Sequence, residues 1–202
     1  MSITNNNTID YYENNASSFA EDTQDVRFTD VQNRFLALLP QSGYILDFGC
    51  GSGRDTKYFI TRGYQVDASD GSERLCEIAS KNTGIAVEHM LFSELDEDAK
   101  YDGIWACASI LHAPGEELKT VFEKMIKAVK PGGYIYTSFK YGEYEGYRKD
   151  RYYTDFTSES FRGFARDFPE IVIIDEWISA DVRPGRGDEK WLNLILRRSD
   201  TV

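Results

Sequence analysis

The stretch YILDFGCGSG, residues 44–53, constrains the fold of this 202-residue chain more than any other part of it. An apolar run leads into an acid and then into three glycines that alternate with small residues. This order is typical of a buried strand followed by a tight turn and a helix. Glycine allows a ligand to approach the main chain closely, and the N–H groups at a helix start favour electron-rich groups. The stretch therefore predicts a ligand-binding turn.

The composition limits the kinds of partner that such a turn could bind. Hydrophobic residues make up 41% of the chain and charged residues 28%, which is typical of a globular protein. No apolar run reaches the roughly 20 residues needed to span a bilayer, and the start MSITNNNTID lacks the regions of a signal peptide. The net charge of -11 would repel a phosphate backbone. We expect a cytoplasmic monomer or homodimer with a small-molecule partner, without nucleic acid or membrane.

The cysteines do not suggest a metal or a disulfide framework. Cys50, Cys76 and Cys107 are widely spaced, no CxxC pair occurs, and the chain has only two histidines. Structural metal sites and disulfide scaffolds both need closely patterned ligands. We expect no metal.

Apolar runs and helical patterns alternate along the chain, which indicates parallel βαβ units in a doubly wound α/β sheet. Strands are expected over residues 44–48, 64–68, 86–92, 101–110, 134–139, 171–177 and 191–197. The last two are joined only by a loop and should pair antiparallel. The tyrosine- and glycine-rich segment 140–156 reads as too irregular for a strand. Helices are expected over residues 9–19, 54–62, 72–80, 116–129 and 158–167, with another ending at Pro40 and residues 1–8 frayed.

The spacing of the glycines distinguishes two kinds of nucleotide site. In the dinucleotide pattern GxGxxG the third glycine would fall on Arg54 or on Thr56, so neither frame fits. An acid before the turn, alternating glycines and a second acid after strand two resemble instead motifs I and II of the class I S-adenosylmethionine-dependent methyltransferases. Those positions are here Asp47, Gly49, Gly51, Gly53 and Asp70.

The resemblance covers roughly residues 44–198. YDGIWACASILH resembles the fourth-strand motif of that family, and KPGGYIYTSF resembles its later turn and fifth strand. GCGSGRDT, WACASILH and SFKYG look most similar to small bacterial enzymes related to tellurite-resistance methyltransferases, a kinship that does not identify a substrate. The resemblance implies a Rossmann-like, mostly parallel seven-stranded sheet of order 3-2-1-4-5-7-6 with an antiparallel last strand. Residues 1–40 would form a helical cap of the same domain and residues 41–202 the methyltransferase domain.

The resemblance also implies the cofactor, S-adenosylmethionine, with S-adenosylhomocysteine as product. Asp70 would accept hydrogen bonds from the ribose hydroxyls, although a helix-capping carboxylate is the alternative. This chain lacks the usual acid at the end of strand three, which leaves the adenine to other partners. The expected cofactor residues are Asp47, Gly49, Cys50, Gly51, Gly53, Asp70, Gly71, Ser72, Met90, Leu91, Phe92, Ala106 and Cys107.

Methyl transfer is an in-line displacement, so the protein mainly holds the two reactants in line and excludes water. If the acceptor must lose a proton, His112 is the candidate catalytic base; the alternative is that it only lines the pocket. The arginines after strand five suggest an anionic acceptor, or else a solvated surface paired with acids. Expected acceptor contacts are Tyr11, Tyr12, Tyr141, Arg148, Arg151 and Arg183.

The sequence thus predicts a methyltransferase that acts on a small molecule. The rivals are a non-catalytic S-adenosylmethionine-binding module, a protein methyltransferase and a nicotinamide oxidoreductase. Nucleic-acid modification is disfavoured because the positions of the DPPY-type motif read CASILH and no Pro-Cys nucleophile occurs.

Overall fold

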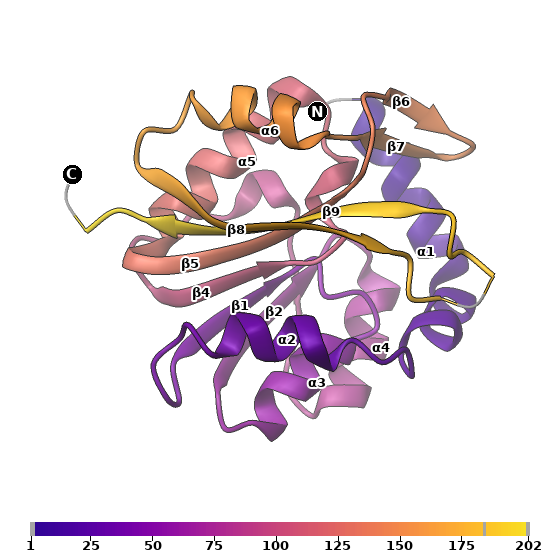
Figure 1. Ribbon diagram of the computed structural model, residues 1–202. Coiled ribbons are helices and arrows are strands. Elements are labelled where there is room, and N and C mark those ends of the chain that lie inside the picture. Colours follow the sequence, from indigo (N-terminus) through magenta and orange to yellow (C-terminus); the bar gives the residue numbers. More distant parts are fainter. Residues whose placement is uncertain (1–2, 184, 201–202) are drawn as a thin grey trace.

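A seven-stranded sheet forms the centre of the computed structural model, which describes residues 3–183 and 185–200 (Figure 1). The strand order is β3-β2-β1-β4-β5-β9-β8. β9 runs antiparallel to both of its neighbours, and the other pairs in the sheet are parallel. Since β8 and β9 are the predicted sixth and seventh strands, the predicted order is confirmed. The strands are β1 (Tyr44–Phe48), β2 (Gln65–Asp70), β3 (Glu88–His89), β4 (Tyr101–Ala106), β5 (Val129–Lys140), β8 (Ile171–Ala180) and β9 (Lys190–Arg198).

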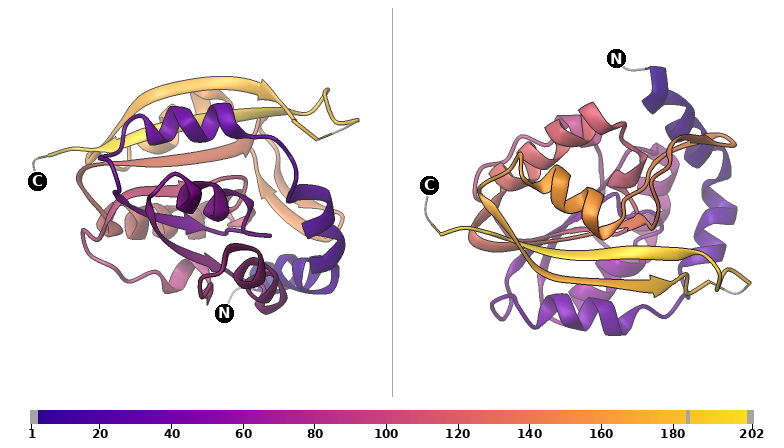
Figure 2. Two further views of the ribbon diagram at one scale, coloured as in Figure 1. Left: turned by 90° about the horizontal axis from the view of Figure 1, so that it is seen from below. Right: turned by 45° about the horizontal axis from the view of Figure 1, so that its top comes forward.

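Helices cover both faces of the sheet. In Figure 1, α2, α3 and α4 lie below it and α5 and α6 above it, while α1 crosses its end. Figure 2 shows α1 from two further sides. Among the described residues, no helix combines the length and apolar character needed to cross a membrane. The helices are α1 (Ile3–Thr23), α2 (Thr29–Leu36), α3 (Arg54–Thr61), α4 (Glu73–Thr83), α5 (Gly115–Ala128) and α6 (Ser158–Ala165).

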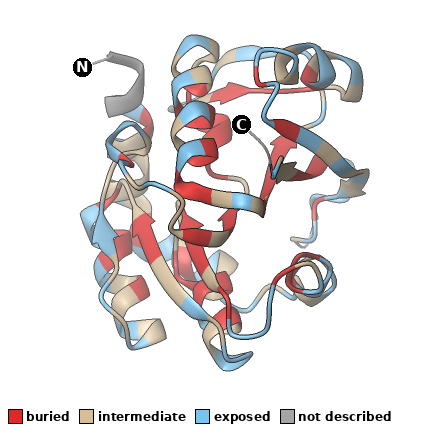
Figure 3. Ribbon diagram, turned by 90° about the vertical axis from the view of Figure 1, so that its left-hand side faces the viewer, coloured by how far each residue is buried: buried red, intermediate tan, exposed pale blue. Residues whose placement is uncertain are grey.

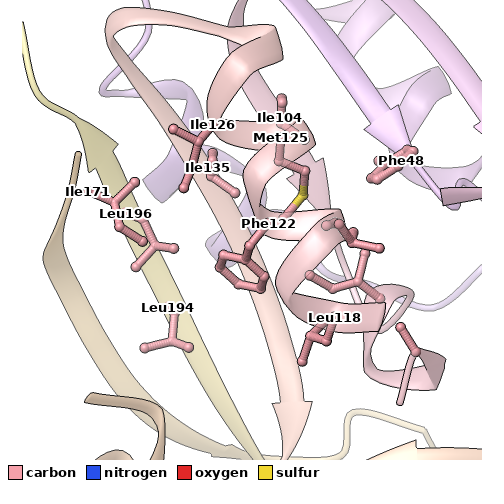
Figure 4. Packing of buried hydrophobic residues seen from close by; sticks show 14 of the residues in the cluster. Phe48, Ile104, Leu118, Phe122, Met125, Ile126, Ile135, Ile171, Leu194 and Leu196 are labelled. Carbon is pink, nitrogen blue, oxygen red and sulfur yellow. The ribbon is translucent and has the colours of Figure 1, made fainter. Parts of the chain in front are cut away.

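The central strands are buried on both faces, which explains their nearly continuous apolar sequence (Figure 3). Successive side chains point to opposite faces. Ile104 therefore joins the cluster around α5, while its neighbour Trp105 joins the cluster around α2. Figure 4 shows the first cluster, in which Phe122 and Met125 of α5 pack toward the sheet. In the second, Trp105 stacks on Tyr136 with ring centroids 4.0 Å apart.

Gly103 sets how closely α2 approaches the sheet. A Cβ atom placed there would lie 2.7 Å from Cζ of Phe35 and 2.9 Å from Cδ1 of Leu39. The missing side chain on β4 therefore makes room for the two residues that close this half of the core.

The prediction that segment 140–156 holds no strand is wrong. β6 (Glu145–Arg148) and β7 (Arg151–Thr154) pair antiparallel as a separate hairpin. Its turn is Lys149-Asp150, and Lys149 has a φ of 55°. β6 is mostly exposed, whereas β7 ends in buried Tyr153 and Thr154. Because the outward positions carry charges, the alternation that marks a half-buried hairpin is hard to recognise.

Several predicted boundaries also shift. β3 is short because Glu94 accepts a hydrogen bond from the Leu91 N–H (2.8 Å), which starts the 3-10 turn Phe92–Glu94. β4 stops at Ala106, and a second 3-10 turn, Ile110–His112, begins only at the last residue of the expected strand. β5 begins at Val129, so KPGG lies within an irregular part of the strand. α1 is longer than the expected residues 9–19, and residues 1–2 lie outside the described part.

Candidate functional site

The glycine turn after β1 lies at the carboxyl ends of the parallel strands. The N–H groups of Gly49 and Cys50 both donate to the Ser69 carbonyl at 2.9 Å, which fixes the turn to the end of β2. Gly49 has a φ of +82°, and a Cβ atom there would lie 2.4 Å from Cβ of Ser109. Glycine is required here both for the backbone conformation and for the close approach of the loop after β4.

Asp70 joins the glycine turn to α4. It is the last residue of β2, and its two carboxylate oxygens accept from the N–H groups of Gly51 and Ser72, each at 2.9 Å. Burial raises the pKa of Asp70, opposed by these backbone hydrogen bonds. The helix cap itself is Ser72, whose hydroxyl accepts from Leu75 N–H. A carboxylate offers about four lone-pair positions, so the Asp70 carboxylate keeps capacity for a further donor.

A second pair of acids lies beneath the turn. Asp47 is only 2% exposed and accepts from the Thr56 hydroxyl at 2.5 Å. Asp55 accepts from Arg54 at 2.8 and 2.9 Å and from the Trp105 indole N–H at 2.9 Å. Burial, and then the charge of Asp55, raise the pKa of Asp47. Burial opposes ionisation of Asp55 too, but the Arg54 cation outweighs it and lowers the pKa of Asp55. Asp47 is therefore the member of the pair that takes up a proton more readily.

A cavity of about 820 Å³ lies over this edge of the sheet. Its wall combines the glycine turn, side chains of α1, the β6–β7 hairpin and the segment between β8 and β9. The structure thereby brings together most of the predicted site residues. Those that line the cavity are Tyr12, Gly49, Cys50, Gly51, Asp70, Gly71, Ser72, Met90, Leu91, Phe92, Cys107, His112, Tyr141, Arg148, Arg151 and Arg183.

Four predicted site residues do not line the cavity. The Asp47 carboxyl points inward to Thr56, and Ala106 is fully buried in the core. Gly53, with a φ of +80°, caps α3, where a Cβ atom would meet the side chains of α4. The Tyr11 ring lies against Arg151, 4.6 Å from the guanidinium carbon to the ring centroid. These four would act on a ligand only through neighbouring groups.

His112 is a neutral imidazole with one defined tautomer. Its Nδ1 lies 2.6 Å from the Tyr152 carbonyl oxygen, and a carbonyl only accepts, so Nδ1 carries the proton. Nε2 lies 2.8 Å from the Tyr12 hydroxyl oxygen and accepts a hydrogen bond from that hydroxyl. Burial lowers the pKa of His112 to about 4 and raises the pKa of Tyr12 to about 12. At neutral pH the basic nitrogen of His112 is therefore occupied by a protonated phenol.

Ion pairs hold two of the predicted acceptor arginines. Arg148 donates to both oxygens of Asp155, at 2.8 and 2.5 Å, and Arg183 donates to both oxygens of Asp181, at 2.9 and 2.5 Å. These pairs agree with the alternative of arginines matched to nearby acids.

Sequence reasoning missed several side chains of the wall. Arg54 and Asp55 follow directly on the glycine turn, and an acid at the start of a helix was an available signal. Ser109 is not among them, because it belongs to the fourth-strand motif; it lines the cavity and donates to the Phe48 carbonyl at 2.6 Å. Trp191 and Asn193 of β9 had no local signal, because only the antiparallel pairing with β5 brings them here.

The chemistry of the wall fits a nucleoside better than a metal or a covalent intermediate. The spare acceptor positions of Asp70 suit a pair of hydroxyls, and Leu91 and Phe92 supply apolar surface. Burial raises the pKa of the Cys107 thiol to about 12, which disfavours a thiolate nucleophile. Within the described residues, no group of three or more His, Cys, Asp or Glu could hold a metal ion.

Comparison with known proteins agrees with this picture. Residues 45–133 match a family model described as "Methyltransferase domain". Over 94 residues the chain is 30% identical to the ubiquinone biosynthesis O-methyltransferase of Rickettsia conorii, with 44% of this chain and 32% of that protein aligned. The curated relatives that it matches are aligned over only 32% to 56% of their own length.

Two solved structures share the whole architecture. The 1,6-didemethyltoxoflavin-N1-methyltransferase of Burkholderia thailandensis, with its substrate and S-adenosylhomocysteine bound, is 24% identical with a TM-score of 0.70, covering 95% of this chain and 90% of that one. The magnesium protoporphyrin IX methyltransferase of Synechocystis PCC 6803, with bound S-adenosylmethionine, is 16% identical with a TM-score of 0.74, covering 98% and 99%.

The fold is therefore the Rossmann-like fold of the methyltransferases. Residues 45–133, the part of the chain that the family model matches, run from β1 to the KPGG turn.

Proposed function

We propose that the protein is an S-adenosylmethionine-dependent methyltransferase that methylates a small molecule by in-line displacement. The observation that carries the proposal is one cavity shared by the glycine turn with Asp70 and by the aromatic and cationic wall from the β6–β7 hairpin. Donor and acceptor could lie there side by side. The domain match and the cofactors bound by the structural neighbours add support.

When bound, S-adenosylmethionine would supply a methyl group on a sulfonium. Asp70 would hold the ribose hydroxyls, and the glycine turn would bring main chain close to the methionine portion. Leu91 and Phe92 would flank the adenine. Tyr12 and Phe19 of α1 would cover the ligand. This cover would exclude water and help to hold the two reactants in line.

The state of His112 bears on which acceptors fit. An imidazole with a pKa of about 4 is a weak base, and Tyr12 already occupies its Nε2. The pair suits an acceptor that reacts without prior loss of a proton, such as an amine lone pair or an anion that is already ionised. We propose that His112 positions Tyr12 over the cavity.

Thermal unfolding with ligands tests the cofactor. S-adenosylhomocysteine at about 100 times its dissociation constant should add roughly 2.7 kcal/mol to the free energy of unfolding, and NAD should add nothing. Stabilisation by NAD alone would replace the proposal with an oxidoreductase.

Turnover tests the reaction. The protein is incubated with S-adenosylmethionine and a panel of thiols, small carboxylates and oxyanions, tellurite among them, and S-adenosylhomocysteine is quantified. Product that depends on a small acceptor is expected. Binding without product from any acceptor would favour a non-catalytic module, and product only with added protein would favour a protein methyltransferase. The tellurite arm also tests the proposed kinship with tellurite-resistance-related enzymes.

A further inference from the structure

We infer that Arg151 binds a carboxylate of the methyl acceptor, so that the natural substrate is a small organic carboxylate. This inference rests on the proposed function and identifies the substrate class of the same cavity.

Among the described residues, Arg151 is the half-buried arginine of the wall that lacks a carboxylate partner, whereas Arg186, which also lacks one, is exposed. Arg148 and Arg183 each donate to both oxygens of an aspartate. No carboxylate of the described residues lies within ion-pair distance of Arg151. Of the two arginines of the hairpin, one is therefore neutralised within the protein and the other is not.

Arg151 is nevertheless removed from much of the solvent. Its guanidinium lies 4.6, 5.7 and 5.4 Å from the ring centroids of Tyr11, Tyr12 and Tyr153. One of its N–H groups donates to the Tyr12 hydroxyl at 3.3 Å. Aromatic faces compensate part of the lost hydration of a cation, but they do not neutralise it. A half-buried cation without a counter-ion is costly unless a ligand supplies one.

The position of this cation suits the acceptor. The Tyr12 hydroxyl contacts both Arg151 and Nε2 of His112, and all three residues line the cavity that contains Asp70. An anion bound at Arg151 would therefore lie close to the Tyr12 hydroxyl, in the cavity that also contains Asp70. The fork of guanidinium N–H donors matches the two oxygens of a carboxylate.

The local charge balance also favours an anionic acceptor. Between residues 138 and 193 the cavity wall carries seven lysines and arginines against four aspartates and glutamates. This excess of positive charge occurs in a protein whose net charge is -11. A wall with an excess of positive charge suits an acceptor that carries a negative charge.

Ligand binding to the protein–S-adenosylhomocysteine complex tests the inference without turnover. Benzoate and phenylacetate are compared with their uncharged amides, benzamide and phenylacetamide, by thermal unfolding and titration calorimetry. We expect the carboxylates to bind more tightly than the amides. In Arg151→Gln their dissociation constants should rise about 10-fold to 100-fold, the usual effect of losing a charge-assisted hydrogen bond.

The matched substitution is Arg186→Gln, at a second arginine of the same wall that is exposed. It should keep the preference for carboxylates, and equal losses in both variants would overturn the assignment to Arg151. Carboxylates that bind no better than amides would also overturn it, as would Arg151-dependent binding of inorganic phosphate alone. Weaker S-adenosylhomocysteine binding in Arg151→Gln would instead place Arg151 on the donor. If S-adenosylhomocysteine does not stabilise the wild-type protein at all, the proposed function fails first.

Discussion

At the scale of single residues, Asp70 links two parts of the site that are distant in sequence. Its two oxygens fix the glycine turn and the start of α4 relative to one another. The same oxygens face a cavity that they share with the aromatic residues of α1. The carboxylate that fixes the turn is therefore the same one that we propose binds the ligand.

Asp70→Asn should weaken S-adenosylhomocysteine binding by about 10-fold to 100-fold, because a hydrogen bond to a charged group contributes roughly 1.5–3 kcal/mol. Titration calorimetry measures the effect. Asp67→Asn is the control on the same strand, since Asp67 pairs with Tyr44 and Lys100 outside the cavity. Equal affinities of both variants for the ligand would exclude the role of Asp70.

The buried His112 should make the fold sensitive to acid. Its pKa is about 4 in the folded protein and about 6.5 in an unfolded chain. Between these values the unfolded chain binds a proton that the folded protein does not, so the free energy of unfolding falls as the pH is lowered. From pH 7 to pH 5 this contribution should amount to about 2 kcal/mol.

Urea unfolding at pH 7, 6 and 5 checks this effect. In His112→Asn, whose amide can still donate to the Tyr152 carbonyl, the fall in stability should be smaller than in the wild type by that amount. His89→Asn, at an exposed position of β3, controls for loss of a histidine. Parallel pH profiles for the wild type and His112→Asn would show that His112 does not ionise in this range.

At the scale of elements, α1 is held by polar contacts to both sides of the cavity. Glu13 accepts from the Ser72 hydroxyl at 2.6 Å on the cofactor side. On the hairpin side, the Thr8 hydroxyl accepts from the Tyr152 N–H at 3.0 Å and Tyr12 donates to His112. A ligand that fills the cavity would contact the same helix, so binding should stabilise α1.

Thr8→Val should loosen α1, because it leaves the Tyr152 N–H without its acceptor at nearly constant side-chain volume. An unsatisfied buried donor costs about 1–3 kcal/mol. Hydrogen exchange of α1 peptides should become faster, and S-adenosylhomocysteine should slow it again. Ser18→Ala, whose hydroxyl bonds only within the exposed side of the helix, should exchange like the wild type. Unchanged exchange in Thr8→Val would show that this contact does not hold the helix.

Elements that are marked by local sequence were predictable, and those that depend on distant partners were not. The glycine turn and Asp70 lie within one βαβ unit, where the strand, turn and helix follow directly from the order of residues. The pairing of Arg148 with Asp155 requires the hairpin, which the charged outer positions concealed. The contact between Tyr12 and His112 spans 100 residues and leaves no local pattern. The sequence therefore named most of its candidate residues from the cavity wall without showing which of the arginines are paired with acids.

At the scale of the whole molecule, the packing of α2 on the sheet depends on Gly103. Gly103→Ala should lower the free energy of unfolding by about 1–3 kcal/mol, because the added methyl would overlap Phe35 and Leu39 in a closely packed core. Chemical denaturation measures the change. Gly163→Ala in α6, where nothing lies within 4 Å of the added atom, should be neutral or stabilise by up to about 1 kcal/mol. A higher denaturation midpoint for Gly103→Ala than for Gly163→Ala would contradict this account of the packing.

The contacts of α1 also bear on how the chain matures during synthesis. Thr8 of α1 contacts Tyr152 of the hairpin, which lies 144 residues later in the sequence. Domains fold as units while the chain emerges from the ribosome, so α1 is made first but has no hairpin to dock on until β7 has left the exit tunnel. Truncated chains that stop before β7 would therefore carry the glycine turn but lack the hairpin wall of the cavity. We expect such chains to bind the ligand only after synthesis has passed β7.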